Sequence, residues 1–384
     1  MTSTLCNEQQ KPGVPAQIAT RLAFFVAGFG MAAWAPLVPF AKARIGIDDG
    51  SLGLLLLCIG AGSMLAMPLT GFLTGRLGCR PVILLAGLAL CIDLPLLVLM
   101  NTTTGMALAL LLFGAAIGMI DVAMNVQAVV VERASGKAMM SGFHGFFSVG
   151  GIAGAGGVSL MLWLGLSPLL ATGVTVLTIA ALLILASRNL LRESGGEEGG
   201  PMFVLPRGWV MFIGILCFIM FLAEGSMLDW SALFLTTLRG VDHSQAGLGY
   251  ALFSITMTIG RLNGDWVVNK LGRYKVLLLG SLCAAIGLSL AIVFNNAMVS
   301  LIGFMLVGLG ASNVVPILFS AAGNQHDMPA NLAIASVTTV GYAGILAGPA
   351  LIGFIAQFSS LTAAFACVAV LLLAVTASAR AITR

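Results

Sequence analysis

Residues 51–100 read SLGLLLLCIGAGSMLAMPLTGFLTGRLGCRPVILLAGLALCIDLPLLVLM, two apolar runs joined by a short basic segment. A helix needs about 20 apolar residues to cross a bilayer, and the runs at 51–74 and 81–100 each meet that length. The segment between the runs carries Arg76 and Arg80. This stretch therefore predicts a helical hairpin that crosses a membrane twice.

The whole chain has a composition that suits such hairpins. Of its 384 residues, 59% are apolar and 8% are charged, whereas soluble domains have about 45–50% apolar and 25% charged residues. This composition excludes a globular soluble enzyme. No basic run resembles a nucleic-acid patch, and the scattered cysteines show neither CxxC pairs nor metal-ligand spacing. We expect a polytopic membrane protein in a lipid bilayer, with no cofactor, metal or nucleic-acid partner.

Apolar runs bounded by Gly, Pro, Asn and charges predict twelve spans. We place them at residues 18–41, 51–74, 81–100, 105–131, 138–163, 167–187, 208–237, 245–269, 275–294, 298–322, 331–356 and 361–381. The longest polar connection, 188–207, falls at the midpoint. We therefore expect an all-α protein with six-helix bundles at 1–187 and 208–384, joined by this linker.

The orientation follows from Lys and Arg, which are in excess in cytoplasmic loops. With these spans, fourteen such residues fall on one side and three on the other, namely Lys42, Arg44 and Arg239, while Arg261 lies within a span. The side with fourteen also holds both termini and the linker. We therefore expect the termini to be cytoplasmic.

The opening hairpin recurs 194 residues later in the chain. Gly53-Leu54 aligns with Gly247-Leu248, and Arg76-Leu77-Gly78 aligns with Lys270-Leu271-Gly272. Helices 2–3 and 8–9 therefore repeat at equal depth and in the same orientation. Parallel repeats of six spans are typical of carriers that bind their substrate near mid-membrane, between the halves.

On these residues the sequence resembles the major facilitator superfamily over its whole length. The signature of that family between helices 2 and 3 is Gly-x-x-x-Asp-Arg/Lys-x-Gly-Arg/Lys-Arg/Lys. In the first copy the matching residues are Gly71, Arg76, Gly78 and Arg80. In the second copy they are Lys270, Gly272 and Arg273, and Asp265 takes the position of the first glycine. The resemblance implies that these residues take part in gating. The resemblance implies alternating access by two bundles around a central cavity.

The signature departs from the family at its acidic position. Gly75 in the first copy and Asn269 in the second replace the Asp through which the family latches its cytoplasmic gate. The signature therefore does not predict that latch.

A closer resemblance, to the YbjJ-type branch of bacterial inner-membrane carriers, rests on four segments: Asp121-Val-Ala-Met-Asn125, Gly142-Phe-His144-Gly, Ala223-Glu-Gly-Ser-Met-Leu-Asp-Trp230 and Gly260-Arg261…Gly264-Asp265.

Charged residues inside spans are functional hypotheses, because each costs about 2.5–3.5 kcal/mol at the bilayer centre. The candidates for proton coupling are Asp121, Glu224, Arg261, Asp93 and His144. Asp121 and Asn125 share a helix face, where they either bind a proton, cation or solute or join helices by hydrogen bonds. Glu224 either exchanges a proton or stays protonated against a carbonyl group.

Other polar residues also leave two interpretations open. Arg261 either neutralises Asp265 at i+4 or holds a carboxylate in one conformation and releases it in another. His144 either transfers protons or forms a hydrogen bond at the gate. Asp229 serves either gating or an interfacial contact, and Asp93 has no obvious partner in the sequence.

Four residues are candidates for binding the solute: Asn125, Trp34, Tyr342 and Asn313. Trp34, which lies just before Pro36 and Pro39, is the best single candidate to stack on a ring. The chain has no GxxxxGK[ST] loop for ATP. We therefore expect a monomeric secondary transporter that moves a small polar organic solute with protons. The alternatives are efflux of amphipathic compounds or lipids and a non-transporting membrane sensor; an enzyme is disfavoured.

Overall fold

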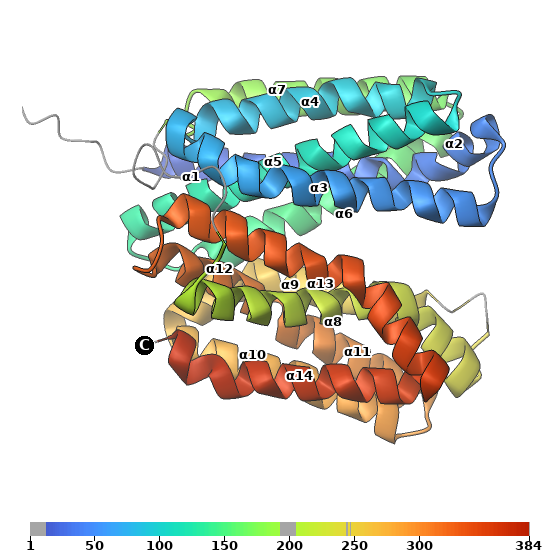
Figure 1. The fold of residues 1–384 in the computed structure, drawn as a ribbon, viewed down its shortest axis with the longest axis vertical. Helices are drawn as coiled ribbons and strands as arrows, with labels where there is room; N and C mark the ends of the chain where they lie inside the picture. Colours follow the sequence, from blue (N-terminus) through green and yellow to red (C-terminus); the bar gives the residue numbers. More distant parts are fainter. Residues whose placement is uncertain (1–12, 193–204, 243–244, 246, 384) are drawn as a thin grey trace, which may run out of the picture.

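The computed structural model describes residues 13–192, 205–242, 245 and 247–383, which are almost entirely helical (Figure 1). The first half of the chain forms α1 (Val14–Ala33), a 3₁₀ turn η1 (Ala35–Leu37), α2 (Val38–Ile45), α3 (Asp49–Leu77), α4 (Cys79–Leu99), α5 (Thr103–Ser135), α6 (Met140–Trp163) and α7 (Pro168–Ser187). The second half forms α8 (Gly208–Arg239), α9 (Leu248–Leu271), α10 (Arg273–Val293), α11 (Ala297–Ala311), α12 (Val314–Asn324), α13 (Ala330–Phe358) and α14 (Leu361–Ile382). Residues 193–204 of the predicted linker lie outside the described residues.

The helices gather into two bundles that lie side by side in Figure 1, α1–α7 above and α8–α14 below. Within the first bundle α3 packs on α5 and α1 packs on α6; within the second, α8 packs on α13 and α10 packs on α11. Two contacts dominate between the bundles, α3 with α13 and α6 with α9. We call the end at which α1 begins and α14 ends the basic end, at the left of Figure 1.

Eleven segments of the described residues are long and apolar enough to cross a membrane. The predicted all-helical fold is therefore confirmed. The remaining predicted span corresponds to α9, which has 24 residues but is not among the eleven. Its polar residues Arg261, Asn263 and Asp265 lower its hydropathy. The twelfth crossing stays a prediction.

Two of the predicted spans are interrupted, and prolines explain both interruptions. The span predicted at 18–41 breaks at Trp34, between α1 and η1, because Pro36 and Pro39 have no N–H to donate to the preceding turn. The span predicted at 298–322 breaks between α11 and α12, since Pro316 cannot donate to the carbonyl four residues earlier. Both breaks lie inside segments of membrane-crossing length.

Two of the three cationic residues predicted on the sparsely charged side cap helices. The guanidinium of Arg44 donates to the carbonyls of Met100 and Leu97 at 2.9 and 2.8 Å, at the end of α4. Arg239 donates in the same way to the carbonyl of Ala291 at 2.7 Å, near the end of α10. Cations at helix C-termini are favourable because the last carbonyls lack intrahelical partners. These charges are thus used structurally.

Helix starts differ between the two ends of the molecule. Opposite the basic end, five helices begin after a residue whose own side chain accepts a backbone N–H of the first turn; these residues are Asp48, Thr102, Ser167, Asn296 and Ser360. At the basic end, the first turns of α4, α6 and α8 donate to groups from other elements: the Leu191 carbonyl, the Glu132 and Asp265 carboxylates, and the Asp327 carboxylate. Helix capping therefore ties segments together at this end.

Candidate functional site

An ion pair lies at the centre of the molecule, on α8 and α9. The Nη2 atom of Arg261 is 3.4 Å from Oε1 of Glu224, and both side chains are largely buried. Nη1 of Arg261 donates to the Ser148 hydroxyl of α6 at 3.2 Å, which crosses from one bundle to the other. In the described residues Nε of Arg261 is buried without a hydrogen-bond partner. In this conformation Arg261 therefore pairs with Glu224, and in the described residues no ion pair joins it to Asp265; its release of the carboxylate in another conformation stays a prediction.

A second polar cluster joins α5 to α6. The Asn125 amide donates to the carbonyl and the carboxylate of Asp121, at 2.9 and 3.4 Å. Its oxygen lies 3.2 Å from Nε2 of His144. Asn125 is completely buried, while Asp121 and His144 are partly accessible. These three residues, all predicted as candidates, therefore form one hydrogen-bonded chain from a carboxylate to an imidazole.

Aromatic rings from both bundles surround His144. The ring of Phe24 on α1 lies 5.2 Å from the imidazole, and the ring of Phe319 on α12 lies 5.7 Å from it, measured between centroids. Both phenylalanines are buried. Because Phe24 and Phe319 belong to opposite bundles, the His144 imidazole contacts aromatic rings of both bundles.

Nearer the basic end, Glu132 joins four elements. Its carboxylate accepts the backbone N–H groups of Met139 and Met140, at 2.8 and 2.9 Å, where α6 begins. It also accepts the Arg273 guanidinium at 2.9 Å and the Ser320 hydroxyl at 2.5 Å, both from the other bundle. The Glu132 side chain is only 4% exposed. Such charge-assisted hydrogen bonds are the strong ones in a buried setting.

The second signature copy forms a latch against α6. The Asp265 carboxylate accepts the backbone N–H of Gly142 at 2.8 Å. The Asn269 amide both accepts from the N–H of Ala138 at 3.0 Å and donates to its carbonyl at 2.9 Å. A carboxylate at a helix N-terminus is favoured by the helix dipole. The acid is therefore present one turn earlier than in the family signature.

The first signature copy makes a different contact, with α13. The Asn331 amide donates to the Gly71 carbonyl at 2.7 Å. A Cβ atom on Gly75 would lie 2.6 Å from the Asn331 nitrogen, so the glycine at the family's acidic position makes room for this amide. Both copies thus contact the opposite bundle, the first through the Gly71 carbonyl and the second through Asp265 and Asn269. Neither contact uses an acid at the acidic position of the signature, where the sequence has Gly75 and Asn269.

The remaining gating candidates lie away from these contacts between the bundles. Arg76 stacks on Phe72 at 4.5 Å and Lys270 stacks on Trp266 at 4.8 Å, each on its own helix. Gly78 and Gly272 have φ of +80° and +83°, which glycine adopts readily. Arg80 uses its backbone N–H, which donates to the Leu191 carbonyl at 2.8 Å.

The other predicted residues are dispersed. Asp93 is buried in α4, and Asp229 is exposed on α8. Trp34 is buried, and its indole N–H has no hydrogen-bond partner in the described part of the chain. Tyr342 on α13 meets Phe221 edge to face at 6.0 Å. Asn313, at the break before α12, donates to the Gly260 carbonyl at 3.2 Å.

Five residues that contribute to these contacts are not among the candidates predicted from the sequence: Phe24, Glu132, Ser148, Phe319 and Asn331. Glu132 sits beside Arg133 at a predicted helix end, where a solvated charge is the ordinary interpretation. Ser148 and Asn331 are polar but uncharged, so the free-energy cost of placing a charge in the membrane does not single them out. In the described ranges no group of three or more His, Cys, Asp or Glu is arranged to hold a metal ion.

Two repeated bundles of apolar helices, with largely buried polar clusters where they meet, are the architecture of a membrane carrier. The family model of the Major Facilitator Superfamily matches residues 21–329 and 240–383. The chain therefore belongs to the major facilitator superfamily and is a multi-pass membrane transporter. It is 72% identical over 384 residues to an uncharacterized MFS-type transporter of Yersinia pestis, with 100% of both chains covered.

Solved structures share the fold. The crystal structure of the transporter FucP in the outward conformation has a TM-score of 0.81 and 17% identity, with 98% of this chain and 100% of that chain covered. The proton:xylose symporter XylE, bound to a bromodeoxyglucose, has a TM-score of 0.72 and 12% identity, with 96% and 95% covered. Both likenesses concern the fold alone.

Proposed function

We propose that the protein is a proton-coupled symporter that moves a small polar organic solute across the bacterial inner membrane as a monomer. In this proposal α9 is the twelfth span and the basic end is cytoplasmic. The bundles 1–187 and 208–384, joined by the linker 188–207, rock around a central cavity and expose it to each side in turn. We also propose that the chain belongs to the YbjJ-type branch, on the four segments quoted above.

The observation that carries the proposal is the position of Arg261. Its guanidinium lies 3.4 Å from Glu224 within one bundle and 3.2 Å from the Ser148 hydroxyl of the other. Rocking that opens the basic end would separate α6 from α9 and release Arg261 from Ser148. The charge that faces Glu224 then depends on the conformation. A carboxylate with a state-dependent cationic partner binds its proton more readily in one state, which is what coupling requires.

The polar clusters also favour a polar solute. Asp121, Asn125 and His144 offer acceptors and donors within one hydrogen-bonded chain, and a solute with hydroxyl or amine groups can match them. FucP is a fucose:proton symporter and XylE is a proton:xylose symporter. The shared fold is therefore compatible with symport of a polar solute and protons, and the polar clusters carry the proposal of a polar solute.

The direct test uses purified protein in liposomes. Uptake of sugars, polyols, amino acids and organic acids is measured with and without an inward proton gradient, alongside the internal pH. We expect one solute class to accumulate above its outside concentration only with the gradient, and to acidify the lumen when it enters. The proposal would be overturned if only bulky amphipathic compounds were transported, or if uptake of a polar solute were the same with and without the proton gradient.

A further inference from the structure

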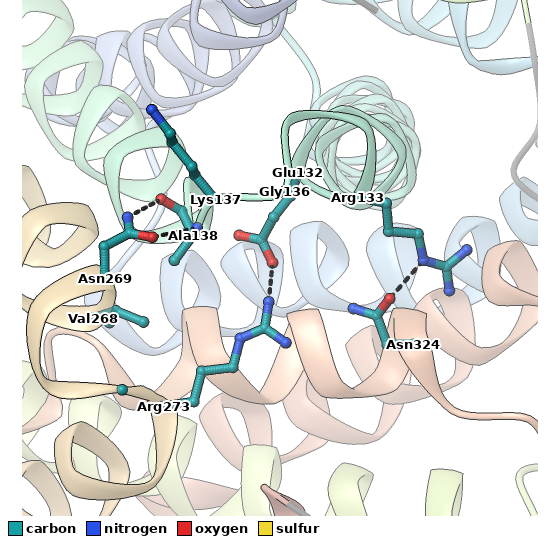
Figure 2. Close-up of a pocket in the computed structure, with 10 residues that line it drawn as sticks. Glu132, Arg133, Gly136, Lys137, Ala138, Val268, Asn269, Arg273 and Asn324 are labelled. Carbon is teal, nitrogen blue, oxygen red and sulfur yellow. Dashed lines mark hydrogen bonds and ion pairs between the residues drawn. The ribbon is translucent and has the colours of Figure 1, made fainter. Parts of the chain in front are cut away.

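A pocket of about 400 Å³ lies between the bundles at the basic end (Figure 2). The first bundle contributes the end of α5 and the connection to α6; the second contributes the connection from α9 to α10 and the end of α12. Because both bundles supply its walls, this pocket exists only while the basic end is closed. No part of the proposed transport site lies in it.

The charge of the lining is predominantly positive. Arg133, Lys137 and Arg273 are exposed residues of the lining, and Glu132 is its single acid. Figure 2 shows Arg133 directed to Asn324 and Arg273 directed to Glu132. The Glu132 carboxylate already accepts four hydrogen bonds, including one from Arg273. Its negative charge is thus compensated by these donors, and among the described residues no acid of the lining pairs with Arg133 or Lys137.

The start of α10 adds unpaired backbone donors at the same place. In the described part of the chain, the N–H groups of Arg273 and Tyr274 have no acceptor among the hydrogen bonds that join elements. The first turns of α4, α6 and α8 at this end all have acceptors from other elements. A helix N-terminus with free N–H groups favours an anion, through the hydrogen bonds and the helix dipole.

The internal repeat allows the start of α10 to be compared with the equivalent start of α4. Arg80 and Tyr274 occupy equivalent positions, 194 residues apart. The N–H of Arg80 donates to the Leu191 carbonyl at 2.8 Å, and a Cβ on Gly78 would overlap the Arg192 carbonyl oxygen. At the equivalent Gly272 no described atom lies within 4 Å of such a Cβ. The first copy therefore holds backbone oxygens where the second copy opens on the basic pocket.

We propose that this pocket binds a phosphate group, from inorganic phosphate or from the headgroup of an anionic phospholipid. The phosphate oxygens accept from the α10 backbone N–H groups and from the guanidinium nitrogens of Arg273 and Arg133 that face the pocket. Lys137 stands at the rim, and among the described residues its amine has no hydrogen-bond acceptor, so its flexible side chain is free to reach the ligand. The bound anion bridges the bundles and favours the closed basic end.

The first experiment uses the full chain in a neutral detergent, free of added lipid. Its thermal stability is titrated with inorganic phosphate against chloride at equal ionic strength. We expect phosphate to stabilise the protein. In Lys137→Gln and in Arg133→Gln the apparent Kd should rise about tenfold, which corresponds to ~1.4 kcal/mol for one lost charged contact. Lys275→Gln is the matched control, since it removes an exposed cation from the same turn of α10 outside the pocket lining.

The second experiment separates the two sources of phosphate. The same proteins are placed in nanodiscs of phosphatidylcholine alone or with phosphatidylglycerol, in buffer without phosphate. A headgroup ligand predicts stabilisation by phosphatidylglycerol that Lys137→Gln and Arg133→Gln weaken and Lys275→Gln does not. A soluble ligand predicts the same pattern with phosphate only. The proposal is overturned if neither source stabilises the protein, or if all three variants respond equally to both.

Discussion

Arg261 and Ser148 are joined across the boundary between the two bundles, with Nη1 of the arginine 3.2 Å from the serine hydroxyl. The same guanidinium pairs with Glu224 in its own bundle at 3.4 Å. One cation thus contacts both a titratable carboxylate and the opposite bundle. Any movement of α6 away from α9 changes the surroundings of the carboxylate. This relationship gives the first prediction.

Glu224→Gln should abolish the coupling of solute transport to the proton gradient. The amide keeps the size of the side chain but has no proton to release, so gradient-driven accumulation of the solute should fall to the equilibrium level. Exchange of labelled for unlabelled solute across liposomes should persist, since it needs no net proton movement. Asp229→Asn is the control, because Asp229 lies exposed on the same helix; it should accumulate solute normally. Equal loss of exchange and accumulation in Glu224→Gln would contradict this role.

Glu132→Gln should shift the protein toward a conformation that is open at the basic end. The substitution weakens hydrogen bonds to Arg273 and Ser320 of the other bundle, and a hydrogen bond to a charged group contributes about 1.5–3 kcal/mol. We expect the closed-to-open ratio to fall about tenfold or more, since ~1.4 kcal/mol changes a ratio tenfold. Distances between spin labels on the α5–α6 and α9–α10 connections measure this shift. An unchanged distance distribution would refute it.

Gly142→Ala should disturb the latch, whereas Gly156→Ala on the same helix should not. A Cβ on Gly142 would overlap the Asp265 carboxylate, while at Gly156 nothing described lies within 4 Å. Both changes raise helix propensity by about 1 kcal/mol, so Gly156→Ala should match or exceed the thermal stability of the parent. Gly142→Ala should unfold at a lower temperature and show a widened basic end. Similar behaviour of the two variants would argue against a tight contact at Gly142.

The sequence predicted the helices well and their contacts across the interface poorly, for physical reasons. Apolar runs and prolines are local signals, and they locate helices such as α3 within a few residues. Charged residues inside spans cost free energy on membrane insertion, and this cost makes Glu224, Arg261 and Asp121 candidates for function. The pairing of Arg261 with Glu224 joins residues 37 positions apart, and no periodicity encodes it.

The latch illustrates the same limit. The signature predicted where the connections lie but not how they bind, because Asp265 occupies a glycine position of the family pattern. Its partner is a backbone N–H of α6, and backbone groups leave no trace in a sequence motif. At Glu132, which ends a predicted helix, the sequence does not distinguish a solvated charge from a gate contact, because its burial depends on α10 and α12 of the other bundle.

Gly75→Asp should destabilise this protein, although it restores the residue that the superfamily signature prefers. The new side chain would begin 2.6 Å from the Asn331 nitrogen and displace the hydrogen bond of that amide to the Gly71 carbonyl. Removing the amide as well, in Gly75→Asp with Asn331→Ala, leaves space for the carboxylate at the first turn of α13, where the helix dipole favours it. The double variant should therefore be more stable than the sum of the single changes predicts. Thermal unfolding of the four proteins measures the coupling, expected at about 0.5–3 kcal/mol for residues in contact. Strict additivity would mean that Gly75 and Asn331 do not share one site.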